Sequence, residues 1–241
     1  MKSIILAAGR GSRIPEISKV KPKSLLKINR KSIISRQISY FKKLKINKII
    51  IIRGYKKNLI NFKSTTFIDN KKFKKNEQLD SLFFAKKELN ENVIVVFSDI
   101  IYDFKVLKKI FEAKNGNIIL GLDNNWKKRY EFRYDHPQEQ ADKVKLNKKK
   151  QVIKIGKRLK AEESHSEFLG MLKLTKIGCQ IFRDNYSKIK KSKTKKMQIH
   201  DFLNFLIKKG VKINSTNING KFMEIDTFND FKLAKKMFKN S

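Results

Sequence analysis

Short, continuous apolar runs recur along the first half of the chain, and segments with helical spacing of their apolar residues separate them. The runs are Ser3–Ala7, Lys48–Ile52, Val93–Phe97 and Ile118–Leu122. A continuous apolar run is typical of a strand that is covered on both faces. The intervening segments, such as Lys31–Leu44, have apolar residues every three or four positions and predict amphipathic helices. This alternation predicts βαβ crossovers and a largely parallel sheet.

The pattern changes after residue 122. Residues 126–142 are polar, aromatic and irregular, and the strands expected beyond them are shorter. A helix is expected over Ile177–Asn185, and the lysine- and serine-rich residues 189–196 are expected to form a solvated linker. We therefore predict an α/β protein with a Rossmann-like mixed, mostly parallel sheet flanked by helices. It would be a single domain, residues 1–241, with a small inserted subregion of strands and loops that holds a substrate.

The formal net charge is +36, from 58 Lys and Arg against 22 Asp and Glu. Such an excess would suit a nucleic-acid-binding protein or an enzyme that attracts anionic substrates. The excess is mostly Lys, is spread over the whole length, and accompanies many Ile, Asn and Phe, residues with A/T-rich codons. A nucleic-acid-binding protein more often clusters its cations on one element with aromatic partners, so we favour compositional drift as the cause.

One cysteine and three histidines limit the chemistry that the chain can carry. A disulfide framework and thiolate metal sites are excluded, and a zinc site is not expected. The N-terminal residues MKSIILAAG run directly into a glycine-rich turn, without the apolar length or cleavage site of a signal peptide. No apolar run approaches the ~20 residues that a membrane span needs. We therefore expect a cytoplasmic protein.

The stretch Leu6–Lys23 has the composition of a phosphate-binding loop. Gly9 and Gly11 permit a tight turn with exposed backbone N–H groups directly after the first predicted strand. Arg13 and Lys23 place positive charge close to the same turn. A glycine-rich turn on its own is more often an ordinary surface turn. Its place at the end of a buried parallel strand favours the binding of a polyphosphate.

Several segments occur in the order found in one enzyme family. LAAGRGSR followed by KPKSLLKI resembles the signature LAAGxGxR…PK of the nucleotidyltransferase superfamily. Ile49–Gly54 resembles the second strand of that family with its turn, Ser98-Asp99 stands where the family has a metal-binding aspartate, and Glu224–Asp230 resembles its terminal segment. The resemblance implies a Rossmann-like enzyme that joins a nucleoside triphosphate to a phosphate-bearing small molecule. Residues of about 1–122 would form the nucleotide-binding half, and about 123–241 the acceptor-binding half with the closing helices.

The resemblance also implies roles for individual residues. The backbone N–H groups of the glycine-rich turn would hold the triphosphate, and Lys23 would neutralise charge at the α-phosphate. The carboxylates of Asp99 and Asp226 would bind Mg²⁺. A role as a helix cap is the alternative for Asp99, and likewise for Ser81. The expected catalytic residues are Arg13, Lys23 and Lys157. The expected nucleotide-binding residues are Leu6, Ala7, Ala8, Gly9, Gly11, Ser12, Arg13, Lys23, Asn76, Gln78 and Ser81.

The middle of the chain resembles one group of enzymes within this superfamily. Trp126–Tyr130, Arg133, His136-Pro137 and Gln140–Val144 look like the choline-phosphate and phosphonoalkyl cytidylyltransferases. This resemblance implies transfer of CMP from CTP to phosphocholine or 2-aminoethylphosphonate, with release of pyrophosphate. Aromatic faces would hold a cationic head group and carboxylates would supply counter-charge, with ordinary packing an equal alternative for the aromatic residues. The expected acceptor-binding residues are Asp123, Trp126, Arg129, Tyr130, Lys143 and Glu167.

Two other functions stay open. A sugar-1-phosphate nucleotidyltransferase belongs to the same superfamily, although the sequence arrangement usual in that group is not seen here. A basic nucleic-acid-binding protein would bind unrelated DNA or RNA tightly and with strong salt dependence. In the favoured interpretation the partners are CTP and a small acceptor, with no specific nucleic acid and no membrane span, and a homodimer is compatible with it.

Overall fold

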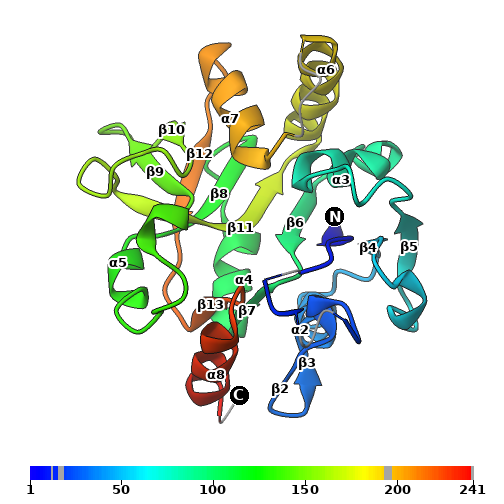
Figure 1. Ribbon diagram of the computed structural model, residues 1–241. Coiled ribbons are helices and arrows are strands. Elements are labelled where there is room, and N and C mark those ends of the chain that lie inside the picture. Colours follow the sequence, from blue (N-terminus) through cyan, green and yellow to red (C-terminus); the bar gives the residue numbers. More distant parts are fainter. Residues whose placement is uncertain (12, 16–18, 193–196, 240–241) are drawn as a thin grey trace.

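A computed structural model describes residues 1–11, 13–15, 19–192 and 197–239, without the side chains of residues 190–192. Within these residues the central feature is a nine-stranded sheet (Figure 1). Its main path is β10-β9-β11-β6-β1-β4-β5, with β8 on β11 and β12 on β8. The strands are β1 (Lys2–Ala7), β4 (Ile49–Arg53), β5 (Thr66–Asp69), β6 (Val93–Phe97), β8 (Ile118–Asp123), β9 (Lys143–Leu146), β10 (Val152–Ile155), β11 (Ser166–Leu174) and β12 (Asn214–Asn217). Two smaller pairs are β2 (Lys27–Ile28) with β3 (Lys31–Ser32), and β7 (Ile100–Tyr102) with β13 (Phe222–Glu224).

The sheet is parallel in its first half and antiparallel around β11. Strand β1 pairs in parallel with β4 on one side and β6 on the other, so that Ile4 lies between Ile50 and Val95. Strand β11 runs antiparallel to β6, β8 and β9. The predicted mixed sheet is therefore confirmed, and its parallel pairings lie among β1, β4, β5 and β6 and between β8 and β12.

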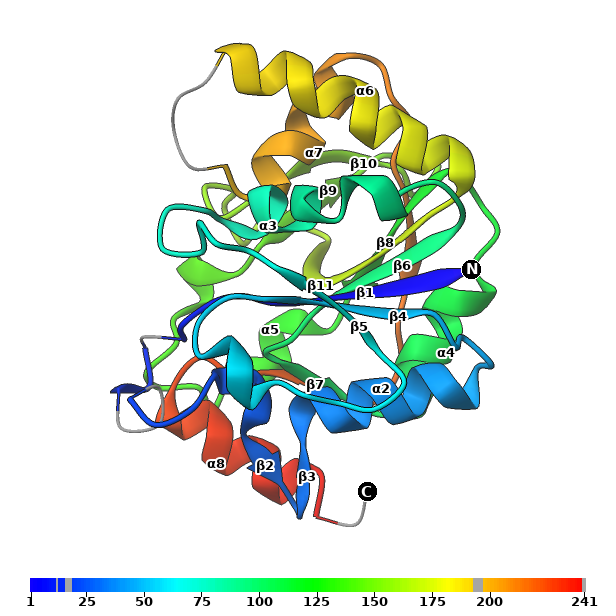
Figure 2. The ribbon, with the colours of Figure 1, turned by 90° about the vertical axis from the view of Figure 1, so that its right-hand side faces the viewer.

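Helices cover both faces of this sheet, as its continuous apolar strands require. Ile4 and Leu6 of β1 belong to the apolar cluster of α3, α6 and α7, whereas Ile5 and Ala7 belong to that of α2 and α4 on the opposite face. Figure 2 shows these two helical layers with the sheet between them. The helices are α2 (Ile33–Lys43), α3 (Gln78–Phe84), α4 (Phe104–Glu112), α5 (Trp126–Arg129), α6 (Lys176–Ser192), α7 (Ile199–Lys208) and α8 (Phe228–Met237).

A third apolar cluster ties the C-terminal segment to the loop that follows β1. Strand β13 pairs antiparallel with β7, and α8 follows it. Met223 and Ile225 are buried in one cluster with Ile14 and Ile101. This packing places the segment after β13 beside the glycine-rich loop, although the two are far apart in the sequence.

The prediction of a solvated linker over residues 189–196 is wrong for its first part, because α6 continues to Ser192. Ile189 is buried in the same cluster as Phe182, so it extends the apolar stripe of the helix among the lysines. Residues 193–196 lie outside the described residues. The strands β2, β3 and β7 are not predicted, because strands of two or three residues have no periodic signal, whereas β13 lies within a strand predicted over Phe222–Ile225. No helix in the described part of the chain is long and apolar enough to cross a membrane.

Candidate active site

The loop after β1 lies close to a neighbouring backbone and to one lysine. A Cβ on Gly54 would lie 2.6 Å from the carbonyl oxygen of Ala8. Gly11 has φ +71°, and a Cβ there would lie 2.9 Å from Cβ of Lys23. Both positions therefore require glycine, and the side chain of Lys23 lies directly against the loop. Ser12 lies outside the described residues.

A cavity of about 230 Å³ opens beside this loop, at the carboxyl ends of β1 and β6. Most residues expected to bind nucleotide line it, together with Phe73, Glu77 and Phe97. Ala7 does not line it, because alternation along β1 turns its side chain to the opposite face of the sheet. The expected residues that line the cavity are Leu6, Ala8, Gly9, Gly11, Arg13, Lys23, Asn76, Gln78, Ser81 and Asp99.

Lys23 stands at the centre of the charged groups. Its Nζ donates to Oδ1 of Asp226 at 2.5 Å and to Oδ2 of Asp99 at 3.3 Å, and its side chain is 9% exposed. Burial acts to lower the pKa of Lys23, but the two carboxylates outweigh it and raise the pKa above its ordinary value. The ammonium group therefore stays charged in this site.

Arg13 pairs with the same buried carboxylate. Nη1 of Arg13 lies 2.7 Å from Oδ2 of Asp226 and donates to Oε1 of Gln140 at 3.0 Å. Burial acts to raise the pKa of Asp226, but Lys23 and Arg13 outweigh it and lower the pKa below its ordinary value. Asp226 is therefore ionised and holds two cations of the glycine-rich segment.

The carboxylates around Lys23 suit a divalent metal. Oδ1 of Asp99 is buried and has no hydrogen-bond partner within the described residues, so an oxygen ligand is available. Ligand atoms of His136, Glu224 and Asp226 lie within 4.8 Å of one another. Nδ1 of His136 already contacts Arg133 at 2.6 Å, and Mg²⁺ prefers oxygen ligands, so the carboxylates are the better candidates. The residues present therefore fit the expected metal.

A buried network behind Asp226 is not predicted from the sequence. Asp230 accepts hydrogen bonds from the backbone N–H groups of Asp226 and Thr227, both at 2.9 Å, at the start of α8. Arg133 donates from Nε to Asp230 at 2.6 Å and from Nη2 to the carbonyl of Glu224 at 3.1 Å. The spacing Thr227-x-x-Asp230 is a helix-start signal that the sequence contains. No sequence signal indicates that Arg133 reaches this helix start from the inserted segment, residues 126–142.

The loop before α3 is organised by Asn70, which was also not singled out in the sequence. Asn70 is buried, its Nδ2 donates to Oγ of Ser81 at 2.9 Å, and its Oδ1 accepts from Asn76 at 3.4 Å. Ser81 lies inside α3, so it does not cap the helix. Oε1 of Gln78 borders the cavity as a buried atom that lacks a hydrogen-bond partner in the part of the chain described. Gln78, one of the expected base-reading residues, thus has a buried polar atom available for a ligand.

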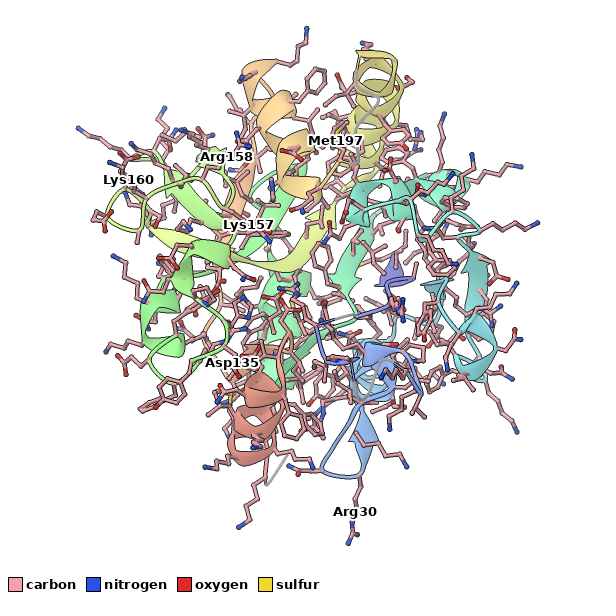
Figure 3. All side chains as sticks on the ribbon, viewed as in Figure 1. Arg30, Asp135, Lys157, Arg158, Lys160 and Met197 are labelled. Carbon is pink, nitrogen blue, oxygen red and sulfur yellow. The ribbon has the colours of Figure 1, made fainter. Side chains whose placement is uncertain are left out.

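A second cavity of about 70 Å³ continues from the first toward the inserted segment, and it shares Arg13 and Asp99 with the first. Lys157 lines this cavity and also a third one, of about 490 Å³, which includes Arg158. Figure 3 places Lys157 and Arg158 between the β9–β10 pair and α7. The expected residues that line the second cavity are Arg13, Gln78, Asp99, Arg129, Lys157, Glu167 and Asp226, and the lining also includes Arg133, Gln140, Asp142, Gln198 and Glu224.

The two aromatic residues expected to face the acceptor do not line either cavity. Trp126 is 1% exposed and packs edge-on against Tyr130 in a small cluster with Ala141. Tyr130 is also buried, and its hydroxyl donates to Oε1 of Glu167 at 2.5 Å. Their apolar surface is used to fold the inserted segment, so Tyr130 reaches the cavity only through Glu167.

Two charged residues expected at the acceptor are likewise engaged elsewhere. Nζ of Lys143 donates to the backbone carbonyl oxygens of Gln138 and Glu139 at 3.2 and 3.1 Å. Asp123 is buried, pairs with Arg129 and accepts from the N–H of Asn125. Lys143 and Asp123 therefore hold the inserted segment in shape.

Glu167 makes the stability of the protein depend on pH. Burial raises the pKa of Glu167 from its ordinary 4.5 to about 7, against the smaller opposing effects of Tyr130 and Arg133, with Asp123 and Asp142 also nearby. Between these two values the folded protein binds more protons than the unfolded chain. The free energy of unfolding should therefore fall as the pH rises from about 4.5 to 7.

Glu167→Gln should remove this fall in the free energy of unfolding, so the variant should be more stable than the wild type above pH 7. The shift corresponds to roughly 3 kcal/mol in the free energy of unfolding. Urea unfolding at pH 5 and at pH 8 measures the effect, with Glu163→Gln, at an exposed position, as the matched control. An equal pH dependence in wild type and Glu167→Gln would show that this carboxyl group titrates normally.

A glycine-rich loop at the end of a parallel strand, lying on a buried lysine between two carboxylates, has the geometry of a nucleotidyltransferase. The chain belongs to the MobA-like NTP transferase family, whose domain model matches residues 3–130. The nucleotidyltransferase class predicted from the sequence is therefore confirmed.

Individual relatives are similar over different shares of the chain. The chain is 28% identical to the CTP:phosphoglutamine cytidylyltransferase of Campylobacter jejuni, over 97% of this chain and 98% of that protein. It is 35% identical to the choline-phosphate cytidylyltransferase of Streptococcus pneumoniae, over 39% of this chain and 43% of that protein.

Two solved structures are similar in fold over almost the whole chain. The inositol-1-phosphate CTP transferase from T. maritima superposes with a TM-score of 0.79 at 20% identity, over 100% of this chain and 96% of that one. The CTP:phosphocholine cytidylyltransferase of Streptococcus pneumoniae superposes with a TM-score of 0.77 at 20% identity, over 98% of each chain. At this level of identity the likeness shows a common fold.

Proposed function

We propose that the protein transfers CMP from CTP to a small phosphorylated acceptor and releases pyrophosphate. The observation that carries the proposal is the position of Lys23, which lies against the glycine-rich loop and between Asp99 and Asp226. A triphosphate in the adjoining cavity would lie against this lysine. The choice of CTP is supported by the similarity, over almost the full length, to the cytidylyltransferase of Campylobacter jejuni.

The reaction in this proposal is a direct displacement at the α-phosphorus of CTP. An oxygen of the acceptor phosphate forms the new bond, the bond to the β-phosphate oxygen breaks, and pyrophosphate leaves with the electron pair. Lys23 would stabilise the charge that builds on the α-phosphate oxygens, and Arg13 would lie along the leaving group. Asp99 and Asp226 would hold Mg²⁺, which supplies further neutralisation of phosphate charge when bound.

The acceptor in this proposal has a polar, hydrogen-bonding head group. Trp126 and Tyr130, the aromatic residues expected to hold a quaternary ammonium group, are packed away from the cavities. The cavity beyond Asp99 is lined mostly by polar residues, Arg129 and Lys157 among them, with Phe97, Phe168 and Phe222 also at its border. A phosphorylated amino-acid amide, the kind of acceptor named for the relative in Campylobacter jejuni, offers amide and carboxylate groups to such a lining.

Phosphocholine is the second candidate acceptor. The carboxyl groups of Glu167 and Asp142 line the same cavity and could face a cationic head group. The partial similarity to the choline-phosphate enzyme supports this alternative. 2-Aminoethylphosphonate and sugar 1-phosphates would be tested beside it.

A panel of four nucleoside triphosphates against these acceptors, with release of pyrophosphate as the readout, tests the proposal. We expect turnover with CTP at least tenfold faster than with UTP, and phosphoglutamine faster than phosphocholine. A sugar 1-phosphate that outpaced every amino-bearing acceptor would overturn the proposed acceptor class. Turnover with UTP or dTTP in preference to CTP would overturn the proposed donor.

A further inference from the structure

The ammonium group of Lys23 occupies the position between the two carboxylates that would bind a metal. It contacts Asp226 at 2.5 Å and Asp99 at 3.3 Å, and its side chain is almost completely buried. Two carboxylates that stabilise one buried cation form a site that favours the binding of positive charge. In the free protein, that charge belongs to the lysine itself.

The oxygen atoms of these carboxylates are nearly all engaged by cationic side chains. Oδ1 of Asp226 and Oδ2 of Asp99 pair with Lys23, and Oδ2 of Asp226 pairs with Arg13. Of the four oxygens, Oδ1 of Asp99 alone has no protein partner within the described residues. A divalent ion that took the oxygens of Asp226 in the free protein would have to displace Lys23 and Arg13, and both side chains would then need another anion.

A triphosphate would supply that other anion. Lys23 and Arg13 both line the cavity beside the glycine-rich loop, and the stem of Lys23 runs against Gly11. Phosphate oxygens in this cavity would lie within reach of both side chains and could draw them away from Asp226. The same phosphates would add oxygen ligands for the metal, because Mg²⁺ is usually bound by one or two carboxylates together with substrate phosphates.

We propose that Lys23 keeps divalent metal out of the free protein, so that the metal binds only together with a nucleoside triphosphate. The part of this inference that concerns the triphosphate rests on the proposed function. The true donor is then the metal–triphosphate complex, and the lysine moves from the carboxylates to the phosphates when that complex binds.

The test is the affinity for Mn²⁺ without nucleotide, followed by the loss of the free Mn²⁺ signal in electron paramagnetic resonance. Wild type should bind Mn²⁺ at least tenfold more weakly than Lys23→Ala, because the substitution frees two carboxylate oxygens. Lys27→Ala removes the same charge at an exposed position and should bind like wild type. Wild type that binds as tightly as Lys23→Ala would overturn the proposal.

A second measurement needs no variant, in case Lys23→Ala does not fold. A CTP analogue with a methylene group between the α- and β-phosphates should raise the affinity of wild type for Mn²⁺ at least tenfold above that of the analogue alone in solution. Equal affinities of wild type for Mn²⁺ with and without the analogue would overturn the proposal. The nucleotide-free comparison does not depend on donor or acceptor, so its failure is distinct from a failure of turnover in the substrate panel.

Discussion

Lys23→Ala should lower the rate of pyrophosphate release from CTP by about 10²- to 10³-fold, the usual cost of losing one group that stabilises transition-state charge. The reason is positional. Lys23 lines the first cavity, its Nζ contacts Asp99, which lines both cavities, and Asp226, which lines the second, and it stays charged there. The initial rate at saturating CTP and acceptor is the measurement, so that the loss is assigned to turnover and not to substrate binding.

Two further variants separate charge from position. Lys23→Arg keeps the charge but carries a larger, planar group against Gly11, and it should recover only a small part of the rate. Lys27→Ala, at an exposed position on β2, should retain full activity. Circular dichroism and urea unfolding check that each variant is folded. If folded Lys23→Ala kept nearly the wild-type rate, the role assigned to Lys23 would be wrong.

Asp226→Asn should have an equal or larger effect on turnover, on the order of 10³-fold. The substitution removes a carboxylate that is proposed to bind the metal and at the same time the anion that holds both Lys23 and Arg13. It also leaves Lys23 buried with Asp99 as its remaining ion-pair partner among the described residues, so the protein should be less stable as well. The initial rate and the midpoint of urea unfolding measure the two effects separately.

Asp135→Asn is the matched control, because Asp135 is exposed on the inserted segment and labelled at its edge in Figure 3. The control should behave like wild type in both measurements. A folded Asp226→Asn variant with more than a tenth of the wild-type rate would contradict the assignment of this carboxylate to the metal and to Lys23.

The architecture of the nucleotide side was predictable because its signals are local. Strand β1 contains the apolar run Ile4–Ala7, and Gly11 in the loop that follows is required by its positive φ and by the side chain of Lys23. Asp99 and Asp226 were singled out by the family resemblance, and each follows a strand, at whose carboxyl end α/β proteins bind ligands. These features depend on a few neighbouring residues, which a sequence displays directly.

The acceptor side was less predictable because the same residue types serve packing and binding. The sequence around Trp126 and Tyr130 is equally compatible with side chains that face a ligand and with side chains that pack together. In the structure they pack against each other. The contact of Arg133 with Asp230 joins residues 97 positions apart, and no local pattern encodes it. The prediction of a linker over the end of α6 is wrong for a similar reason, since the lysines around Ile189 hide the apolar stripe.

The contact between Lys23 and Asp226 joins residues 203 positions apart, and this has a consequence for the newly made chain. Ribosomes add about 5–20 residues per second, so the lysine leaves the tunnel roughly 10–40 s before its carboxylate partner. During that interval the glycine-rich loop and β1 can fold, but Arg13 and Lys23 both lack Asp226. The protein therefore acquires its charged centre in one late step, when α8 docks, and a chain interrupted before that point would carry the loop without its activity.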